Sequence, residues 1–221
     1  MADETEPRAI VRAGYDAVAG RYADLEPPEH EWPRMRWLRA LLARVEPGER
    51  VLDVGCGNGI PAAREIAVAH EAVGIDISGA QIERARENVP DAEFVHSELT
   101  EAGFDEPFAA IVAFYVIEHV PRDEHAEIFE RFHRWLAPGG DLLFTIEPDD
   151  EPGIVGDWLG TPMFFSQHDA ETTLALVRAA GFEVLRAEVE TQVEGDREVA
   201  YLWVLARRGS GNNANRSRSV R

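Results

Sequence analysis

Residues 50–59 read RVLDVGCGNG, an apolar strand that runs directly into three glycines. Pro61 follows where the first turn of a helix would begin, and residues 62–66 continue that helix. A strand that turns sharply into a helix favours glycine, because glycine adopts positive φ at low cost and lets a ligand approach the bare backbone. We therefore predict a ligand-binding turn over Asp53–Gly59. The alternative is a tight turn that binds nothing.

Around this turn, apolar strands alternate with amphipathic helices. The predicted strands are 50–55, 72–76, 92–95, 108–115, 141–146, 183–190 and 198–206, and the predicted helices are 8–23, 35–45, 61–66, 79–88, 128–136 and 169–180. Alternation of this kind is typical of an α/β fold with a mostly parallel sheet and helices on both faces. Residues 194–196 predict a turn that joins the last two strands as an antiparallel hairpin.

The composition is strongly acidic. Asp and Glu number 41 against 22 basic residues, every one of them Arg, and the formal net charge is −19. Nucleic acids and anionic membrane surfaces both require a basic face, so we expect neither as a partner. The acidic, lysine-free composition fits a halophilic, salt-rich cytosol, and it fits a G+C-rich genome equally well.

Cellular location is constrained by one cysteine and by hydropathy. Cys56 is the only cysteine, so no disulfide forms within the chain. Residues 1–6 are acidic and lack the apolar segment of a signal peptide. The longest apolar run, 108–117, is shorter than a membrane span. We predict a cytoplasmic protein, with a disordered basic tail over residues 207–221, which contain no acidic side chain.

Two carboxylates bear on which nucleotide the loop binds. Read from Gly57, the third position of a pyrophosphate fingerprint is Ala62, so the spacing is compatible with NAD. Asp53 favours a different ligand, because a carboxylate at the loop repels pyrophosphate and attracts a cationic amino group. Asp76 ends the following strand, where a carboxylate can accept both hydrogen bonds of a ribose diol. As an alternative, Asp76 is only a helix cap.

These motifs resemble those of class I S-adenosylmethionine-dependent methyltransferases over residues 10–206. Asp53–Gly59 resembles the family's glycine loop and 73–76 its second-strand acidic motif. Residues 94–98, 108–115, 118–121 and 136–140 resemble the segments that follow. The chain departs from the family at Glu98, where Asp is commoner, and at Ala109, where Asp is frequent.

The resemblance implies a Rossmann-like sandwich with a seven-stranded sheet whose last strand is antiparallel. It implies N-terminal helices over 1–46 that cover the cofactor, and a binding domain over 47–206. It places S-adenosylmethionine, and its product S-adenosylhomocysteine, on residues of the loop, the strand ends and the first helix: Asp53, Gly55, Cys56, Gly57, Gly59, Asp76, Ile77, Glu98, Leu99, Phe114, Tyr15 and Tyr22. For the two tyrosines, core packing at helical spacing is the alternative.

His119 is the first candidate for a catalytic base, since it follows the fourth strand at the rim where α/β sheets bind ligands. The alternative is that His119 packs at a helix start or contacts the cofactor through its backbone. The seven histidines show no metal-ligand spacing, so no metal is predicted. The Pro-, Gly- and aromatic-rich segment 147–168 is predicted to shape the substrate pocket with Tyr115, Trp158, Met163, Phe164, Phe165 and His168. A loop packed on the domain edge is the alternative.

The sequence thus predicts methyl transfer to an O, N or C centre of a small organic molecule, by a monomer or homodimer. Two other functions remain open. One is an NAD-binding oxidoreductase, which Asp53 and the closing hairpin disfavour. The other is a catalytically silent, cofactor-binding partner protein, which an intact loop cannot exclude.

Overall fold

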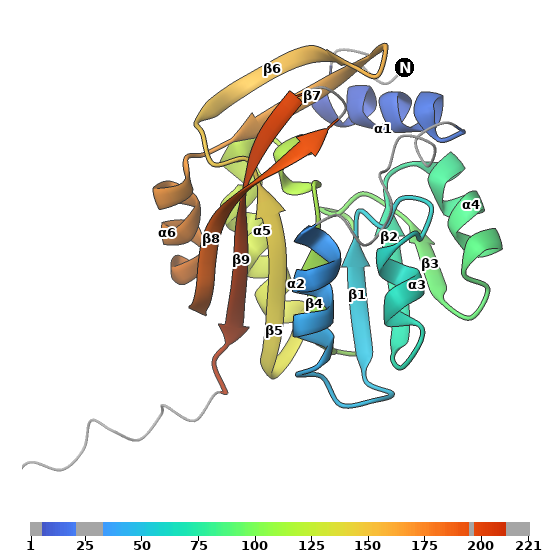
Figure 1. Ribbon diagram of the computed structural model, residues 1–221, viewed down its shortest axis with the longest axis vertical. Helices are drawn as coiled ribbons and strands as arrows, with labels where there is room; N and C mark the ends of the chain where they lie inside the picture. The colour runs from blue at the N-terminus through green and yellow to red at the C-terminus, as the bar shows by residue number, and fades with distance from the viewer. Residues whose placement is uncertain (1–5, 21–32, 195–196, 211–221) are drawn as a thin grey trace, which may run out of the picture.

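The computed structural model describes residues 6–20, 33–194 and 197–210, and its centre is a seven-stranded sheet. The strand order is β3-β2-β1-β4-β5-β9-β8 (Figure 1). The strands are β1 (Arg50–Val54), β2 (Glu71–Asp76), β3 (Glu93–His96), β4 (Phe108–Ala113), β5 (Leu136–Ile146), β8 (Phe182–Glu194) and β9 (Arg197–Arg208). Strands β1 to β5 pair in parallel, and β9 is antiparallel to both β5 and β8. The predicted fold class is confirmed.

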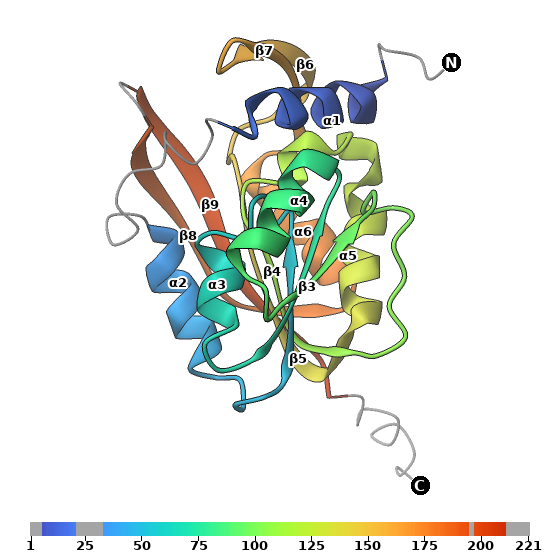
Figure 2. The same cartoon turned by 90° about the vertical axis from the view of Figure 1, so that its right-hand side faces the viewer.

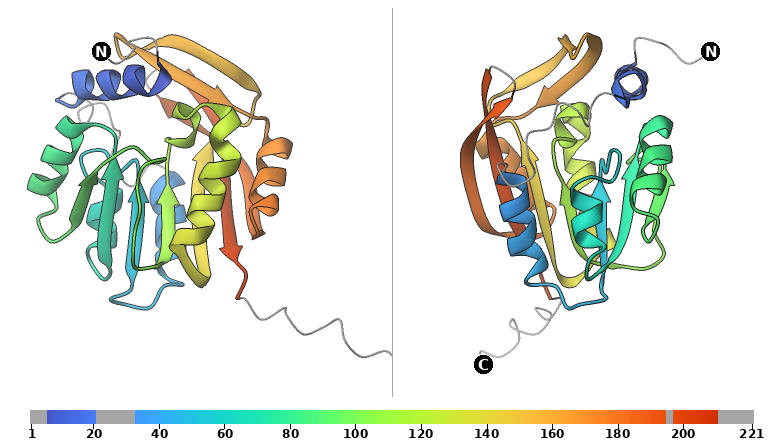
Figure 3. Two further views of the ribbon diagram at one scale, coloured as in Figure 1. Left: turned by 180° about the vertical axis from the view of Figure 1, so that it is seen from behind. Right: turned by 45° about the vertical axis from the view of Figure 1, so that its right-hand side comes forward.

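Helices cover both faces of this sheet. One face carries α2 (Pro33–Leu42), α3 (Ala62–Ile66) and α4 (Gly79–Asn88), and the other carries α5 (His125–Trp135) and α6 (Ala170–Ala179) (Figures 2 and 3). Strands β1 and β4 are apolar on both sides because each face meets helices: Leu52 and Ile111 pack toward α5, and Val51 and Val112 pack toward α2. The strand order reverses between β1 and β4, which is where α/β sheets bind ligands.

The segment 147–168 forms a second, two-stranded sheet. Strands β6 (Glu151–Trp158) and β7 (Thr161–Gln167) pair as an antiparallel hairpin over α1 (Pro7–Val18), which lies across the carboxyl ends of the parallel strands (Figure 1). Gly14 of α1 permits this packing, because a Cβ there would lie 2.7 Å from the Met163 methyl carbon. Met163, one of the apolar residues that predicted a pocket segment, thus packs the hairpin against α1.

Several element boundaries differ from the predictions. The first helix ends at Val18, and residues 21–32 lie outside the described residues. Strand β5 begins at Leu136, so the segment 136–140, predicted to end a helix, belongs to the strand. Strand β9 continues to Arg208, so the predicted tail cannot begin at residue 207; residues 211–221 lie outside the described residues.

Arg207, near the end of β9, contacts a buried carboxylate of the neighbouring strand. Asp141 of β5 is 4% exposed and accepts hydrogen bonds from Arg44 Nε at 2.8 Å and from Arg207 Nε at 2.8 Å. The two guanidiniums reach it from the turn after α2 and from β9. This contact ties together segments that are far apart in sequence.

Asp141→Asn is expected to lower the free energy of unfolding by about 2 kcal/mol, because it leaves two part-buried guanidiniums without their counter-ion. The matched control is Glu127→Gln, which breaks the exposed i,i+4 pair with Arg131 and is expected to cost less than about 0.5 kcal/mol. Urea denaturation of both variants measures the difference. Equal losses in the two variants would contradict a structural role for Asp141.

Within residues 6–20, 33–194 and 197–210 we find no helix with both the length and the apolar character that crossing a membrane requires.

Candidate functional site

The glycine loop after β1 has the backbone that its sequence predicts. Gly55, Gly57 and Gly59 have φ of 66°, 52° and 81°. Gly55 N–H donates to the Ile75 carbonyl at 2.8 Å, which holds the loop against the end of β2. A Cβ at Gly55 would lie 2.7 Å from a Val116 methyl, whereas a Cβ at Gly57 would have no neighbour within 4 Å. Gly57 therefore presents bare backbone to open space.

Asp76 ends β2 directly beside this loop. Its Oδ2 accepts a hydrogen bond from Gly57 N–H at 2.9 Å, and its Oδ1 accepts one from Ser78 N–H at 2.8 Å. Burial raises the pKa of Asp76, while these two backbone donors act in the opposite direction. Each carboxylate oxygen accepts one of these hydrogen bonds and keeps capacity for another, so the site offers two acceptors side by side.

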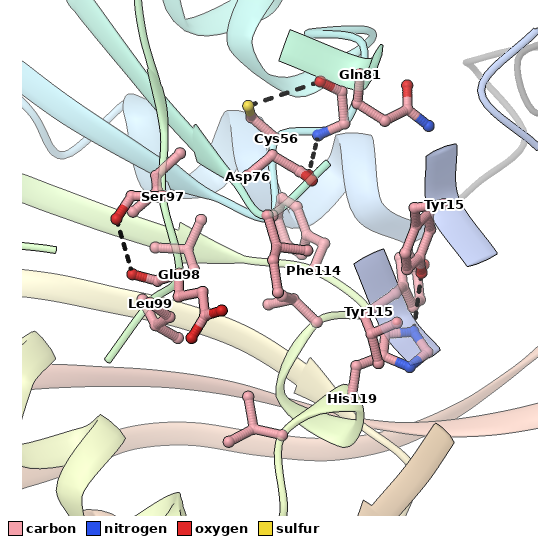
Figure 4. A pocket seen from close by; sticks show the side chains of 18 of the residues that line it. Tyr15, Cys56, Asp76, Gln81, Ser97, Glu98, Leu99, Phe114, Tyr115 and His119 are labelled. Atoms are coloured by element: carbon pink, nitrogen blue, oxygen red, sulfur yellow. Dashed lines mark hydrogen bonds between the residues drawn. The ribbon is translucent and has the colours of Figure 1, made fainter. Parts of the chain in front are cut away.

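A cavity opens between the loop, the carboxyl ends of β2 to β4 and the underside of α1 (Figure 4). It encloses about 1020 Å³ of empty space including its open mouth, enough for a nucleoside-sized ligand. The predicted site residues that line it are Tyr15, Gly55, Cys56, Gly57, Asp76, Ile77, Glu98, Leu99, Phe114, Tyr115 and His119. Residues distant in sequence thus meet at one cavity.

Other predicted residues do not line the cavity. Asp53 is 3% exposed and lies behind the loop, where burial raises its pKa to about 7 and the guanidinium of Arg34 acts against that rise. Gly59 packs toward Val89, which follows α4, and toward Phe94 of β3. Tyr22 lies outside the described residues. Asp53 therefore does not line this cavity, and its role in binding the cofactor stays a prediction.

The predicted substrate-pocket residues of the segment 147–168 are also absent from the cavity lining. Met163 is fully buried against α1, Trp158 packs on Tyr15 from outside, and Phe165 packs on His119. Phe164 contributes its carbonyl to His119, and His168 bonds the Arg122 carbonyl. These residues support the cavity wall, and of the predicted pocket set only Tyr115 lines the cavity.

His119 lies in the cavity wall with both ring nitrogens engaged. Nδ1 lies 2.9 Å from the Phe164 carbonyl and Nε2 lies 2.8 Å from the Tyr15 hydroxyl. The carbonyl can only accept, so Nδ1 carries the proton and Nε2 accepts from Tyr15. Burial lowers the pKa of His119 to about 4. In this arrangement His119 is a neutral, weakly basic group that orients Tyr15.

Helix α1 is held over the cavity by polar contacts. Arg8 and Arg12 both form ion pairs with Glu98, and Asp16 accepts a hydrogen bond from the Ser78 hydroxyl at 2.5 Å. Glu98 lines the cavity as predicted, yet its carboxylate is already paired with α1. A ligand that uses Glu98 therefore shares this carboxylate with the helix above it.

The sequence analysis missed several cavity residues. Arg34 of α2 and Gln81 of α4 line the cavity, although each is at least nine-tenths buried. Neither amide atom of Gln81 has a hydrogen-bond partner among the described residues, which is typical of a group that meets a ligand. Both side chains belong to ordinary helical segments, so the sequence carries no signal for either.

Glu118 is a further buried acid at this end of the sheet. It follows β4 in the short 3₁₀ helix Ile117–His119 and is 3% exposed. Burial, and after it the neighbouring carboxylates of Glu147 and Glu194, raise the pKa of Glu118 to about 8. Glu118 therefore holds a proton in the folded chain over a pH range in which the unfolded chain has released it.

Glu118→Gln is expected to flatten the pH dependence of stability. The unfolded chain loses this proton near its ordinary pKa of 4.5 and the folded chain near 8, so the free energy of unfolding falls as the pH rises between these values. Glutamine does not ionise, so the variant lacks this contribution. Asp53, whose pKa is also raised, still makes the free energy of unfolding fall with rising pH in both the wild type and the variant. Urea denaturation at about pH 5 and about pH 9 measures it, and equal slopes in both proteins would refute the assignment.

Comparison with known proteins agrees with this geometry. A family model described as a methyltransferase domain matches residues 29–187. The arsenite methyltransferase of Halobacterium salinarum is 31% identical over 201 residues, which cover 83% of this chain and 49% of that protein. A ubiquinone biosynthesis O-methyltransferase of Alkalilimnicola ehrlichii is 33% identical over 144 residues, 60% of this chain and 57% of that protein. The chain thus spans about half the length of these curated relatives.

Solved structures share the fold. The magnesium protoporphyrin IX methyltransferase of Synechocystis, with bound S-adenosylmethionine, superposes with a TM-score of 0.73 at 16% identity over 95% of this chain and 100% of that chain. The family model covers most of the chain, and the sheet has the strand order that the sequence motifs imply. The chain therefore belongs to the class I S-adenosylmethionine-dependent methyltransferases.

Proposed function

We propose that this protein binds S-adenosylmethionine in the cavity and transfers its methyl group to a small organic molecule. The pairing of Asp76 with Gly57 carries the proposal: two carboxylate acceptors stand beside an open glycine backbone. A ribose diol matches the acceptors, and the rest of the nucleoside matches the walls formed by Ile77 and Leu99.

Arg34 supports binding of the amino-acid portion of the cofactor. Its guanidinium lies in the cavity wall, 5.8 Å from the centre of the Tyr115 ring. A buried cation favours a carboxylate, and S-adenosylmethionine carries one at the end opposite its adenine. Arg34 and Asp76 would then hold the two ends of the molecule, with Phe114 and Tyr115 between them.

The chemistry asks little of the protein beyond alignment. The sulfonium of the bound cofactor supplies an activated methyl group. The protein must hold a nucleophile in line with the methyl–sulfur bond and exclude water, and this positioning accelerates the displacement. Tyr15, fixed by His119, and Tyr115 border the part of the cavity beyond the loop. Their rigid rings would confine an acceptor there.

A small acceptor is the finer part of the proposal. The net charge of −19 disfavours nucleic acid as the substrate. One relative is named as an arsenite methyltransferase and the other as a ubiquinone biosynthesis O-methyltransferase. These names differ in the acceptor, so they do not select one acceptor class for this chain. A cytoplasmic location and a monomeric or homodimeric state stay predictions.

Calorimetric titration with S-adenosylmethionine, S-adenosylhomocysteine and NAD tests the proposal, at low and at molar salt because the chain is strongly acidic. We expect micromolar binding of the two sulfur ligands and none of NAD. A folded sample that binds NAD, or that binds neither sulfur ligand at either salt concentration, would exclude methyl transfer.

A further inference from the structure

Tyr115 has a backbone conformation that is unusual for its residue type. It lies just after β4 and has a φ of 56°, in the left-handed region that favours glycine. Among the described residues, Leu159 in the turn of the β6–β7 hairpin is the one other non-glycine residue with a positive φ. Such a conformation is costly for a tyrosine, so it persists only where surrounding contacts impose it, and it occurs mostly at active sites and ligand-binding sites. Tyr115 lies at such a place, because it lines the cofactor cavity beside Phe114 (Figure 4).

Three strands hold Tyr115 in this conformation. Its backbone N–H donates to the hydroxyl of Thr145 in β5 at 2.9 Å, and Thr145 is fully buried. Its own hydroxyl donates to Oε1 of Gln192 in β8 at 3.1 Å. Its ring meets the ring of Tyr201 in β9 edge to face, with 4.8 Å between the two ring centres. The backbone, the hydroxyl and the ring of Tyr115 are therefore each fixed by a different strand.

The amide of Gln192 is itself held in place. Gln192 is 8% exposed, and its Nε2 donates to Glu194 Oε1 at 2.7 Å. Because the amide nitrogen is used in this contact, the amide oxygen is turned toward the Tyr115 hydroxyl. None of the described residues of β8 and β9 lines the cavity. These two strands nevertheless determine where one of its wall residues lies.

The fixed ring lies next to the guanidinium of Arg34. The Cζ atom of Arg34 lies 5.8 Å from the centre of the Tyr115 ring, within the range of a cation–π contact. Arg34 is 8% exposed and reaches the cavity from the first turn of α2. A guanidinium binds a carboxylate best through two parallel N–H groups, so the direction of its plane matters. An aromatic ring beside the guanidinium restricts that direction.

We propose that Tyr115 is the positioning residue for Arg34, and that it thereby sets the preference of the cavity for nucleosides that carry a carboxylate. This inference rests on the proposed function, in which Arg34 binds the amino-acid end of S-adenosylmethionine. The Tyr115 ring keeps the guanidinium directed at that carboxylate, and Thr145 and Gln192 keep the ring in place. A ligand with the same nucleoside and sulfur, but without the carboxylate, gains nothing from this arrangement.

Two ligands separate the positioning of Arg34 from a general effect on the fold. S-adenosylhomocysteine carries the carboxylate, whereas 5′-methylthioadenosine keeps the adenosine and the sulfur and lacks the amino-acid end. Calorimetric titration of each protein with both ligands gives the ratio of their affinities. Arg34→Gln sets the reference. It is expected to weaken S-adenosylhomocysteine about thirty-fold and to leave 5′-methylthioadenosine within about two-fold of the wild type.

Tyr115→Asn removes the ring, and asparagine tolerates a positive φ better than most residues. We expect it to weaken S-adenosylhomocysteine about ten-fold, to leave 5′-methylthioadenosine unchanged, and to cause no further loss when combined with Arg34→Gln. Tyr115→Phe and Gln192→Leu each break the hydroxyl contact, so each should weaken S-adenosylhomocysteine about three-fold, and the double variant no more than either. The matched control is Tyr201→Phe, which removes a phenol hydroxyl from the neighbouring ring outside the cavity lining and should bind both ligands as the wild type does.

The outcomes separate this inference from the proposed function. Thermal melting first establishes that each variant is folded, and if Tyr115→Asn is not, Tyr115→Phe and Gln192→Leu decide in its place. If S-adenosylhomocysteine binds the wild type but Tyr115→Asn weakens both ligands equally, weakens neither, or adds its full loss to that of Arg34→Gln, only the positioning role of Tyr115 is overturned. If the wild type binds neither ligand, the proposed function fails and this inference with it. A loss confined to S-adenosylhomocysteine, and absent when Arg34 is already replaced, supports both.

Discussion

Gly57→Val is expected to abolish binding of S-adenosylmethionine, with at least a hundred-fold loss of affinity. A Cβ at Gly57 meets no protein atom within 4 Å, so the valine side chain would extend into the space where the cofactor must lie against the backbone. The Cβ of the new side chain would meet no other part of the protein. The variant should therefore fold, and calorimetric titration measures the loss.

The matched control for Gly57→Val is Gly48→Val. Gly48 has a φ of 84° and also has open space around its Cβ position, but it lies in the turn before β1, away from the cavity. Both substitutions impose the same backbone cost, about 1–2 kcal/mol for a side chain in the left-handed region. If both variants lose affinity equally, backbone strain and not occupation of the cavity is responsible, and the assigned position of the cofactor is wrong.

Asp76→Ala is expected to reduce cofactor affinity by a factor of about 100, since it removes the two acceptors for the ribose hydroxyls. It also removes the hydrogen bonds from Gly57 N–H and Ser78 N–H, so the loop loses its support at the end of β2. Asp76→Asn retains one acceptor oxygen and should give an intermediate loss. Titration with S-adenosylhomocysteine compares these variants.

Asp91→Ala provides the charge-matched control, because Asp91 is exposed in the turn before β3. It should bind S-adenosylhomocysteine as the wild type does. A wild-type affinity in Asp76→Ala would show that the ribose does not lie at this carboxylate.

The sheet and the glycine loop were predictable because local sequence determines both. Strands such as β4 are apolar on both faces, and this pattern follows directly from burial between two layers of helices. The three loop glycines have positive φ as their spacing predicted. Asp76 could be placed because a residue that ends a parallel strand lies at the ligand-binding edge whatever the rest of the chain does.

The substrate side of the cavity could not be predicted in this way. The apolar residues of the segment 147–168 look alike whether they face a ligand or a helix, and only the tertiary contact with Gly14 decides that Met163 is buried. The environment of Glu118 is equally non-local, because the carboxylates that raise its pKa are Glu147, which follows β5, and Glu194, which ends β8. Glu118 was visible only as part of a family motif, and its missing partner can be recognised only in the folded structure.

The contact of Asp141 with Arg44 and Arg207 has a consequence for how the protein opens. The turn after α2 and strand β9 are both fixed to the same carboxylate on β5, through Arg44 and Arg207. If either segment detaches from the sheet, it leaves Asp141 with only one guanidinium partner. Amide protons of α2 and β9 should therefore exchange with solvent in one cooperative event. Fraying at the outer strand β8 would then stop at β9, and the parallel part of the sheet would stay closed.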